Sequence, residues 1–235
     1  MALNKSTGNM YDFITHTWNP IRGTCSHQCK YCYMHSIWDR FPEMRDLQFV
    51  EKEMGTNLGV NKYIFIGSST DIWCTNIPLE WIKRVFNHCM LWPENRYFVQ
   101  TKNPARFVEF ANSLDIGDRY LFFEKFSFCV TIESNRENNY MGDTVSPQER
   151  AWIIKENPFL HNQYVTVEPI MDFGFPSFHY LLAHTQARQI NIGADSGKNN
   201  LPEPSKEKLL RLIDSLGKFT KVKQKDNLKR LLNET

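Results

Sequence analysis

Three cysteines fall within eight residues of this chain: Cys25, Cys29 and Cys32, with the spacing C-x3-C-x2-C. Thiolates this close together can bind three irons of a cubane iron–sulfur cluster. The loop offers no fourth cysteine, so one iron would stay open to a small-molecule ligand, whereas a fully ligated cluster mostly carries electrons. The spacing therefore indicates a place where chemistry is done on a bound molecule.

Other uses of these cysteines are weaker. A structural zinc site needs four ligands, and His16, His27 or His35 could supply the fourth, but a zinc ribbon brings a second C-x2-C pair that this chain lacks. Ferredoxin-type binding needs a fourth cysteine at a set spacing. A cluster of core thiols is disfavoured because the loop is polar. The alternative that stays open is a zinc-stapled nucleic-acid-binding module without catalysis.

Composition limits the class of protein. The chain has 235 residues and a formal net charge of +2, and no apolar run approaches the roughly 18 residues that span a bilayer. The first ten residues lack the apolar stretch of a signal peptide. We expect a cytoplasmic protein with no membrane partner, and the sequence does not give its oligomeric state. Residues 206–230 hold nine Lys or Arg against three acids, so this segment could hold phosphates or form the solvated face of a helix.

Short β-type runs alternate with helical stretches, which predicts βα units and a mostly parallel sheet. Strands are expected at 15–21, 62–66, 96–101, 126–132, 164–167, 189–192 and 220–223. Helices are expected at 35–54, from Pro78 through Cys89, from 103 to 114, after the capping box that begins at Ser146, at 178–185, and after Ser205.

Polar residues follow most of these strands. They are Gly67, Ser68, Ser69 and Asp71 after the second strand, Lys102 after the third, Thr131, Glu133 and Ser134 at the end of the fourth, Glu168 after the fifth, and Asp195 after the sixth. The carboxyl ends of parallel strands meet on one side of a sheet or barrel, where ligands bind. Alternation puts Thr131 and Glu133 on one face, and a buried glutamate without a partner is costly, which favours a functional role.

Several segments together resemble a known family. They are Thr17-Trp18-Asn19-Pro20, Gly23, Cys29-Lys30-Tyr31-Cys32-Tyr33, Gly67-Ser68-Ser69-Thr70-Asp71, Val167-Glu168-Pro169-Ile170, Ile192-Gly193-Ala194-Asp195-Ser196 and Lys223-Gln224. The cysteine loop with an aromatic before its last cysteine resembles the radical S-adenosylmethionine (SAM) superfamily. The order of the segments is similar to the phage Gp37/Gp68-like (DUF5131-type) radical SAM proteins and, more distantly, to spore photoproduct lyase.

This resemblance implies an α/β fold, a partial (β/α)6 TIM-like barrel with a short C-terminal extension. The domain would span 1–235, with its core at about 12–200 and a basic segment at about 203–235. A [4Fe–4S] cluster on the three cysteines would bind SAM through its open iron. One electron, from a reductant such as flavodoxin or ferredoxin, would cleave SAM to methionine and a 5′-deoxyadenosyl radical that abstracts hydrogen from a substrate.

The resemblance also implies residue roles. Gly67, Ser68 and Ser69 occupy the position of the family's element for the SAM amino group but lack its glutamate, for which Asp71 is the candidate substitute. Lys102 is the candidate contact of the SAM carboxylate. The ribose would contact Thr131, Glu133 and Ser134, and the adenine Tyr31. Glu168 and Asp195 could orient the substrate or supply a hydrogen-bonded network under the barrel mouth. Phage-type relatives and the basic segment point to a nucleic acid or nucleotide as that substrate.

Overall fold

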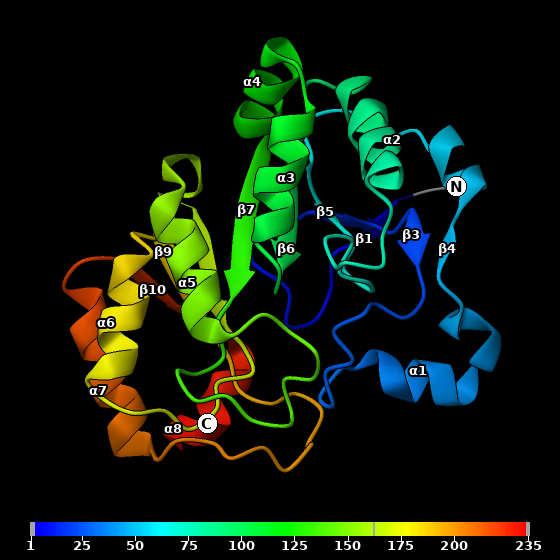
Figure 1. The fold of residues 1–235 in the computed structure, drawn as a ribbon. Helices are drawn as coiled ribbons and strands as arrows, with labels where there is room; N and C mark the ends of the chain where they lie inside the picture. The colour runs from blue at the N-terminus through cyan, green and yellow to red at the C-terminus, as the bar shows by residue number, and fades with distance from the viewer. Residues whose placement is uncertain (1–2, 162, 234–235) are drawn as a thin grey trace. The chain divides into compact units, whose positions relative to one another are not determined.

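Strands and helices alternate along almost the whole chain (Figure 1), whose computed structural model describes residues 3–161 and 163–233. The chain divides into two compact units. The first is Met1–Gln28 with Cys32–Phe128, and the second is Cys29–Tyr31 with Cys129–Thr235. The cysteine loop therefore contributes to both units, and each unit is described by itself.

The first unit holds a sheet in which three strands are parallel. Its strands are β1 (Asn4–Lys5), β2 (His16–Trp18), β5 (Tyr63–Ile66) and β6 (Arg96–Thr101), in that order across the sheet. Only β1 runs antiparallel to its neighbour. A separate antiparallel pair is formed by β3 (Ile21–Arg22) and β4 (Gln48–Phe49). Consecutive parallel strands, each reached through a crossover, are the βα arrangement that the sequence predicts.

The helices of the first unit are α1 (Met34–Arg40), η1 (Pro42–Arg45), η2 (Glu51–Gly55), α2 (Leu79–Met90), α3 (Ala105–Ser113) and α4 (Ile116–Lys125). They differ in how much they bury, from several side chains in α2 to none in the 3-10 helix η1. Along α2, Ile82, Val85, Phe86 and Cys89 are all buried, at the spacing that places them on one face. The helix α4 is not predicted from the sequence pattern. Asp115 caps it by accepting the Asp118 N–H at 2.9 Å.

Two predicted elements are wrong in their extent, and prolines explain both. The helix expected over 35–54 ends at Arg40, because Phe41 before Pro42 leaves the helical region (φ −134°, ψ 76°) and Pro42 cannot continue the hydrogen-bond ladder. Gln48–Phe49 then pairs with Ile21–Arg22 as a strand. The strand expected over 15–21 is split into β2 and β3 by the intervening Pro20, which has no N–H to donate.

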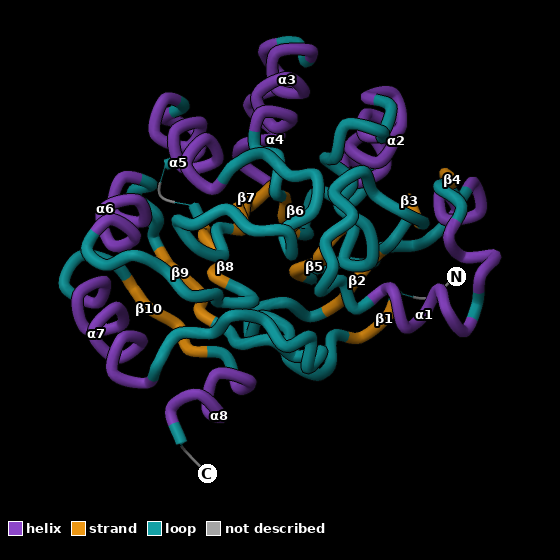
Figure 2. Tube along the Cα trace, turned by 60° about the horizontal axis from the view of Figure 1, so that its bottom comes forward, coloured by secondary structure: helices purple, strands orange, loops and turns teal. Residues whose placement is uncertain are grey.

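The second unit holds parallel strands that follow one another in chain order. They are β7 (Phe126–Thr131), which begins in the first unit, β8 (Tyr164–Val167), β9 (Gln189–Ile192) and β10 (Lys221–Gln224). Its helices are α5 (Pro147–Glu156), η3 (Pro158–Leu160), α6 (Ser177–His184), α7 (Lys206–Gly217), η4 (Asp226–Leu228) and α8 (Lys229–Leu232). Figure 2 shows α6 and α7 side by side, and α7 packs against β10.

The α/β prediction is confirmed, since both units combine helices with mostly parallel strands. The bounds of β6, β8 and β9 are those predicted. Ser146 and Ser205 cap their helices, accepting the N–H of Glu149 at 3.1 Å and of Lys208 at 3.3 Å. Within residues 3–161 and 163–233, every helix is too short or too polar to cross a membrane.

Candidate functional site

The three cysteines of the loop are all free thiols. Cys25 and Cys32 are half-buried in the first unit, and Cys29 is buried in the second. The Cys74 thiol lies beside the Cys25 sulfur and 2.8 Å from the Asn76 amide oxygen. The hydrogen bond with Cys74 lowers the pKa of Cys25 to about 6. Cys25 is thus set up as a thiolate, the form in which cysteine binds metal.

Lys102 acts on a second cysteine of the loop. Burial raises the pKa of the Cys32 thiol, and the charge of Lys102 opposes that shift. The Lys102 residue is half-buried, and its charge acts on Cys32. Among the described residues, no three His, Cys, Asp or Glu side chains are gathered as a metal site. Because Cys29 belongs to the other unit, the cluster stays a prediction that rests on spacing.

Hydrogen bonds from the segment after β5 hold the start of the cysteine loop. Thr70 donates its hydroxyl to the Gly23 carbonyl at 2.9 Å. The Asn76 side chain donates to the Thr24 carbonyl at 3.2 Å and accepts the Ser26 N–H at 3.1 Å. The backbone of the loop is therefore fixed by side chains from one neighbouring segment.

Gly23 enters this loop in a conformation and a space that suit only glycine. Its φ is +106°, and a Cβ built there would lie 2.3 Å from the Asp46 carbonyl oxygen. A side chain would therefore be strained and would also displace backbone.

Asp71 gathers four hydrogen bonds onto one carboxylate. His27 Nε2 lies 2.8 Å from Oδ2, which also accepts the Thr101 hydroxyl at 2.8 Å and the Lys102 N–H at 3.0 Å. Oδ1 accepts the Trp73 N–H at 3.0 Å. Burial raises the pKa of Asp71, but His27 and these donors outweigh burial, so the pKa lies below its ordinary value. Asp71 thus ties a residue of the cysteine loop to the ends of β5 and β6.

The turn after β5 is held by residues near the cysteines. The Asn19 side-chain oxygen accepts the Ser69 N–H at 3.1 Å, and its amide also bonds the Ser68 hydroxyl at 3.1 Å. Tyr33, which directly follows Cys32, donates its hydroxyl to the Ser68 carbonyl at 3.0 Å. Gly67 has a φ of +76°. The predicted residues of this turn therefore lie together, and part of their hydrogen-bonding capacity shapes the turn itself.

Glu133 is the corresponding carboxylate of the second unit. Its side chain and that of Arg150 are both fully buried, with Arg150 Nη1 2.7 Å from Glu133 Oε2. Tyr31 donates its hydroxyl to Oε1. Arg150 also donates to the carbonyls of Thr131, at 2.7 Å, and Val145, at 2.6 Å. Burial, and then the charge of Glu133, raise the pKa of Tyr31. Glu133 thus holds the residue before Cys32.

Arg150 is the residue that the sequence did not single out. It is the fourth residue of α5, near the positive end of the helix, where cations are disfavoured. That position was the available signal, because a buried arginine there needs a carboxylate partner.

Ser134 is fully buried and shapes its loop. Its hydroxyl donates to the Asp172 carbonyl at 2.7 Å and accepts the Arg136 N–H at 3.0 Å. Together with Thr131 and Glu133 it places the three predicted ribose contacts on one short segment of buried chain.

Glu168 meets residues from the ends of two other strands of the second unit. Its Oε2 pairs with Lys225 Nζ at 2.6 Å, and its Oε1 accepts from Asn227 at 2.8 Å. A Cβ at Gly193 would lie 2.6 Å from Oε1, so glycine makes room for the carboxylate. The structure therefore brings the ends of β8, β9 and β10 together around Glu168.

Asp195 is engaged within its own loop. Its carboxylate accepts the N–H of Gly197 at 2.9 Å, and the N–H and side-chain amide of Asn199 at 2.5 and 2.7 Å. This pattern is that of an aspartate that stabilises a turn. The contact set gives Asp195 a structural duty and does not by itself favour the predicted role at a substrate.

Comparisons with known proteins place the chain in a family. Two solved structures match, both of spore photoproduct lyase variants, each with a TM-score of 0.59 and 11% identity over 98% of this chain and 78% of the lyase. One holds a dinucleoside spore photoproduct, and the other holds that compound and bound AdoMet. At this identity the likeness shows a shared fold. No curated protein matches. Residues 9–202 match the family described as "Protein of unknown function (DUF5131)". The chain therefore belongs to the DUF5131 family.

Proposed function

We propose that this protein is a radical SAM enzyme. The observation that carries the proposal is the C-x3-C-x2-C spacing of three free thiols, which are soft donors suited to an iron–sulfur cluster. Cys25, Cys29 and Cys32 would hold a [4Fe–4S] cluster, which would supply the electron for reductive cleavage of SAM. The fold shared with a lyase whose structure holds AdoMet supports the same proposal.

The strand order supports a partial (β/α)6 barrel. In each unit the parallel strands neighbour one another in chain order, with β2, β5 and β6 in the first and β7 to β10 in the second. Sequential order of parallel strands within each unit is what a barrel requires. In barrels the catalytic residues follow the carboxyl ends of the strands. We also propose that the protein is related to the phage Gp37/Gp68-like proteins.

Two carboxylates position the cysteine loop under this proposal. Asp71 holds His27, two residues before Cys29, and Glu133 holds Tyr31, one residue before Cys32. Both contacts fix loop residues that lie next to proposed ligands in the chain. A loop held in this way limits how far the thiolates move when no cluster is bound. Both carboxylates should therefore favour binding of the cluster to the three cysteines.

The remaining residues would bind SAM and exclude water from it. Ser68 and Ser69 offer oxygen atoms to the amino group, and the Lys102 ammonium suits the carboxylate. Thr131, Glu133 and Ser134 are the proposed ribose contacts, and a ribose would have to replace the bonds that Glu133 and Ser134 form with protein groups. Glu168, held by Lys225 and Asn227, is better placed than Asp195 to orient a substrate.

A nucleic acid or nucleotide is the proposed substrate. The matched lyase structures hold a dinucleoside compound, and residues 206–230 of this chain carry nine cationic side chains against three acids. Phosphate binding accounts for such a balance, and it predicts an affinity that falls steeply with salt.

Anaerobic reconstitution tests the proposal. The full chain is loaded with iron and sulfide, reduced with dithionite or flavodoxin and mixed with SAM. We expect about four irons per chain and release of 5′-deoxyadenosine. The triple variant C25A/C29A/C32A should bind no cluster, whereas C129A, which removes a buried thiol outside the loop, should keep it. Zinc at unit stoichiometry without iron would favour the nucleic-acid-binding module, and a loaded cluster that releases no 5′-deoxyadenosine would refute the enzyme.

A further inference from the structure

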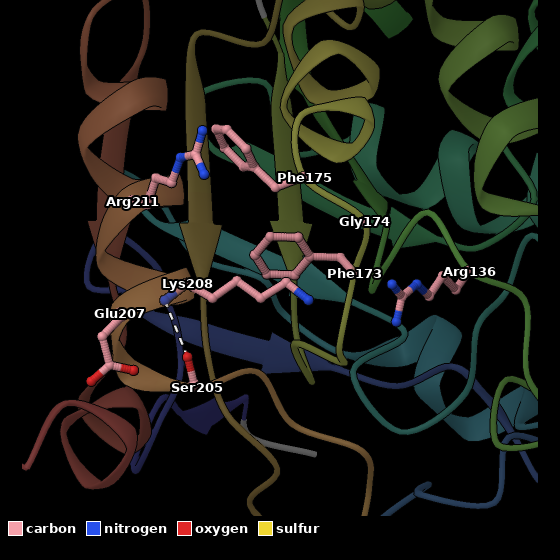
Figure 3. Close-up of a pocket in the computed structure, with 8 residues that line it drawn as sticks. All are labelled: Arg136, Phe173, Gly174, Phe175, Ser205, Glu207, Lys208 and Arg211. Carbon is pink, nitrogen blue, oxygen red and sulfur yellow. Dashed lines mark hydrogen bonds between the residues drawn. The ribbon is translucent and has the colours of Figure 1, made fainter.

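A cavity in the second unit lies outside the site described above. It has a volume of about 500 Å³ and is lined by the loops after β7 and β8 and by the first turns of α7 (Figure 3). Its lining residues are Arg136, Phe173, Gly174, Phe175, Ser205, Glu207, Lys208 and Arg211. This volume is within the range of cavities that bind small molecules and exceeds what a lone inorganic anion fills. The size alone therefore fits a ligand of about nucleotide size.

Three cations from two segments converge on this cavity. Arg136 and Lys208 both pair with Asp172, each at 2.5 Å, so two positive charges share one carboxylate. Arg211 has no carboxylate partner among the described residues. Glu207 also lines the cavity, but Figure 3 shows its side chain pointing away from Arg211. The cavity therefore carries an excess of positive charge.

The cationic groups are held in place by rings. The Arg211 guanidinium lies 4.0 Å from the centre of the Phe175 ring, and Lys208 Nζ lies 4.8 Å from that of Phe173. A guanidinium held over a ring keeps its N–H donors in a fixed plane, available at their outer edge. Ser205 is occupied as the helix cap, with its hydroxyl accepting the Lys208 N–H at 3.3 Å. Arg211 is thus the best-prepared donor of the cavity.

We infer that this cavity binds a phosphate group of a nucleic-acid strand, with Arg211 as the main contact and Arg136 and Lys208 beside it. Planar guanidinium forks match phosphate oxygens, and two arginines with a lysine supply more positive charge than Asp172 neutralises. The surrounding sequence adds to the attraction, because α7 and the residues after it hold all nine cationic residues of the basic segment 206–230. The inference rests on the proposed function for the substrate class and deepens it by naming where the strand is held.

Binding can be measured without SAM cleavage, which separates this inference from the proposed function. The full chain is titrated into a fluorescein-labelled single-stranded oligonucleotide of about ten nucleotides, followed by anisotropy between roughly 50 and 200 mM salt. We expect Arg211→Ala to weaken binding about five- to tenfold and to flatten the dependence on salt, and Arg211→Lys to recover part of it. Bound oligonucleotide without 5′-deoxyadenosine release would count against the enzyme and leave the cavity assignment standing.

Arg188→Ala is the matched control. Arg188 is also an exposed arginine of the second unit stacked on a ring, 4.8 Å from the centre of Tyr164, but it does not line the cavity. Equal losses in the Arg211 and Arg188 variants would overturn the inference, as would absence of oligonucleotide binding at low salt. Inorganic phosphate tests the source of the phosphate: if it binds and the oligonucleotide does not compete, the nucleic-acid assignment is wrong. An oligonucleotide with a neutral methylphosphonate backbone should bind no better to the wild type than to the Arg211 variant.

Discussion

Asp71 in the first unit and Glu133 in the second do the same work by different means. Each carboxylate holds one residue of the cysteine loop, His27 or Tyr31. Glu133 is fully buried against a fully buried arginine, whereas Asp71 retains 14% of its side-chain exposure and relies on His27 and neutral donors. A buried ion pair fails badly when one partner is removed, while a set of neutral donors loses strength by degrees. Loss of one partner should therefore destabilise the protein more at Glu133 in the second unit than at Asp71 in the first.

Removal of Arg150 should produce the largest effect. Arg150→Met would leave Glu133 buried without a counter-charge, and we expect a loss of about 3–5 kcal/mol in the free energy of unfolding, measured with urea. The double variant Arg150→Met/Glu133→Gln should recover part of this loss, because no charge then stays buried. A single-variant loss below about 1 kcal/mol would show that Glu133 is not held as an ion pair.

Substitution of Asp71 should cost less. Asp71→Asn keeps the shape but weakens charge-assisted hydrogen bonds, and we expect a loss of about 1.5–3 kcal/mol in the same measurement. Glu51→Gln is the control, since Glu51 forms an exposed pair with Arg84 and should leave unfolding unchanged. The comparison between the two anchors breaks down if Asp71→Asn costs more than Arg150→Met.

The Asp71 contribution should disappear in acid. Because the pKa of Asp71 in the folded chain lies below its ordinary value of 3.8, the unfolded chain binds this proton more tightly. The stability that the carboxylate adds is complete above the ordinary pKa and is lost as pH falls through the lowered one. The difference in melting temperature between wild type and Asp71→Asn should therefore be constant near neutrality and shrink below about pH 4. A difference that grows on acidification would contradict the direction of the shift.

The Tyr31 hydroxyl should give the smallest effect. Tyr31→Phe removes one donor from the charged Glu133 but leaves Arg150 in place, so we expect a loss of about 1.5 kcal/mol, the lower end for a bond to a charged group. Tyr33→Phe removes an exposed hydroxyl that donates to the Ser68 carbonyl, and it should cost clearly less in the same unfolding experiment. Similar losses of unfolding free energy in the two variants would mean that the buried bond from Tyr31 to Glu133 stabilises the protein no more than the exposed bond from Tyr33.

The sequence predicted best the elements whose signals are local. The β6, β8 and β9 strands are short apolar runs ended by polar or small residues, and Ser146 and Ser205 are helix caps decided within one turn. The helix expected over 35–54 is wrong because Pro42 follows its observed end at Arg40, and because β4 forms by pairing with β3, a contact between distant residues. Strand pairing of this kind leaves little trace in a short window.

For the candidate site, the sequence predicts which residues follow the strands, but it does not predict their hydrogen-bond partners. Position after a strand was enough to select Asp71, Glu133 and Glu168, since strand ends converge in parallel folds. Their partners His27, Arg150 and Lys225 come from other segments, and nothing in the local pattern pairs them. The premise that a buried Glu133 lacks a partner does not hold, because Arg150 supplies one.

The backbone conformation of Gly23 sets the direction in which the chain leads to Cys25, the first cysteine of the loop. Gly23 lies between two segments that are distant in sequence. A Cβ added to it would lie 2.3 Å from the Asp46 carbonyl oxygen, and its own carbonyl accepts the Thr70 hydroxyl. If every amino acid is tested at position 23, we expect almost no substitution to give a folded protein, even alanine, which adds only one methyl group. Natural variation among relatives should be equally narrow there, which makes position 23 a sensitive marker for chains that keep the same entry into the loop.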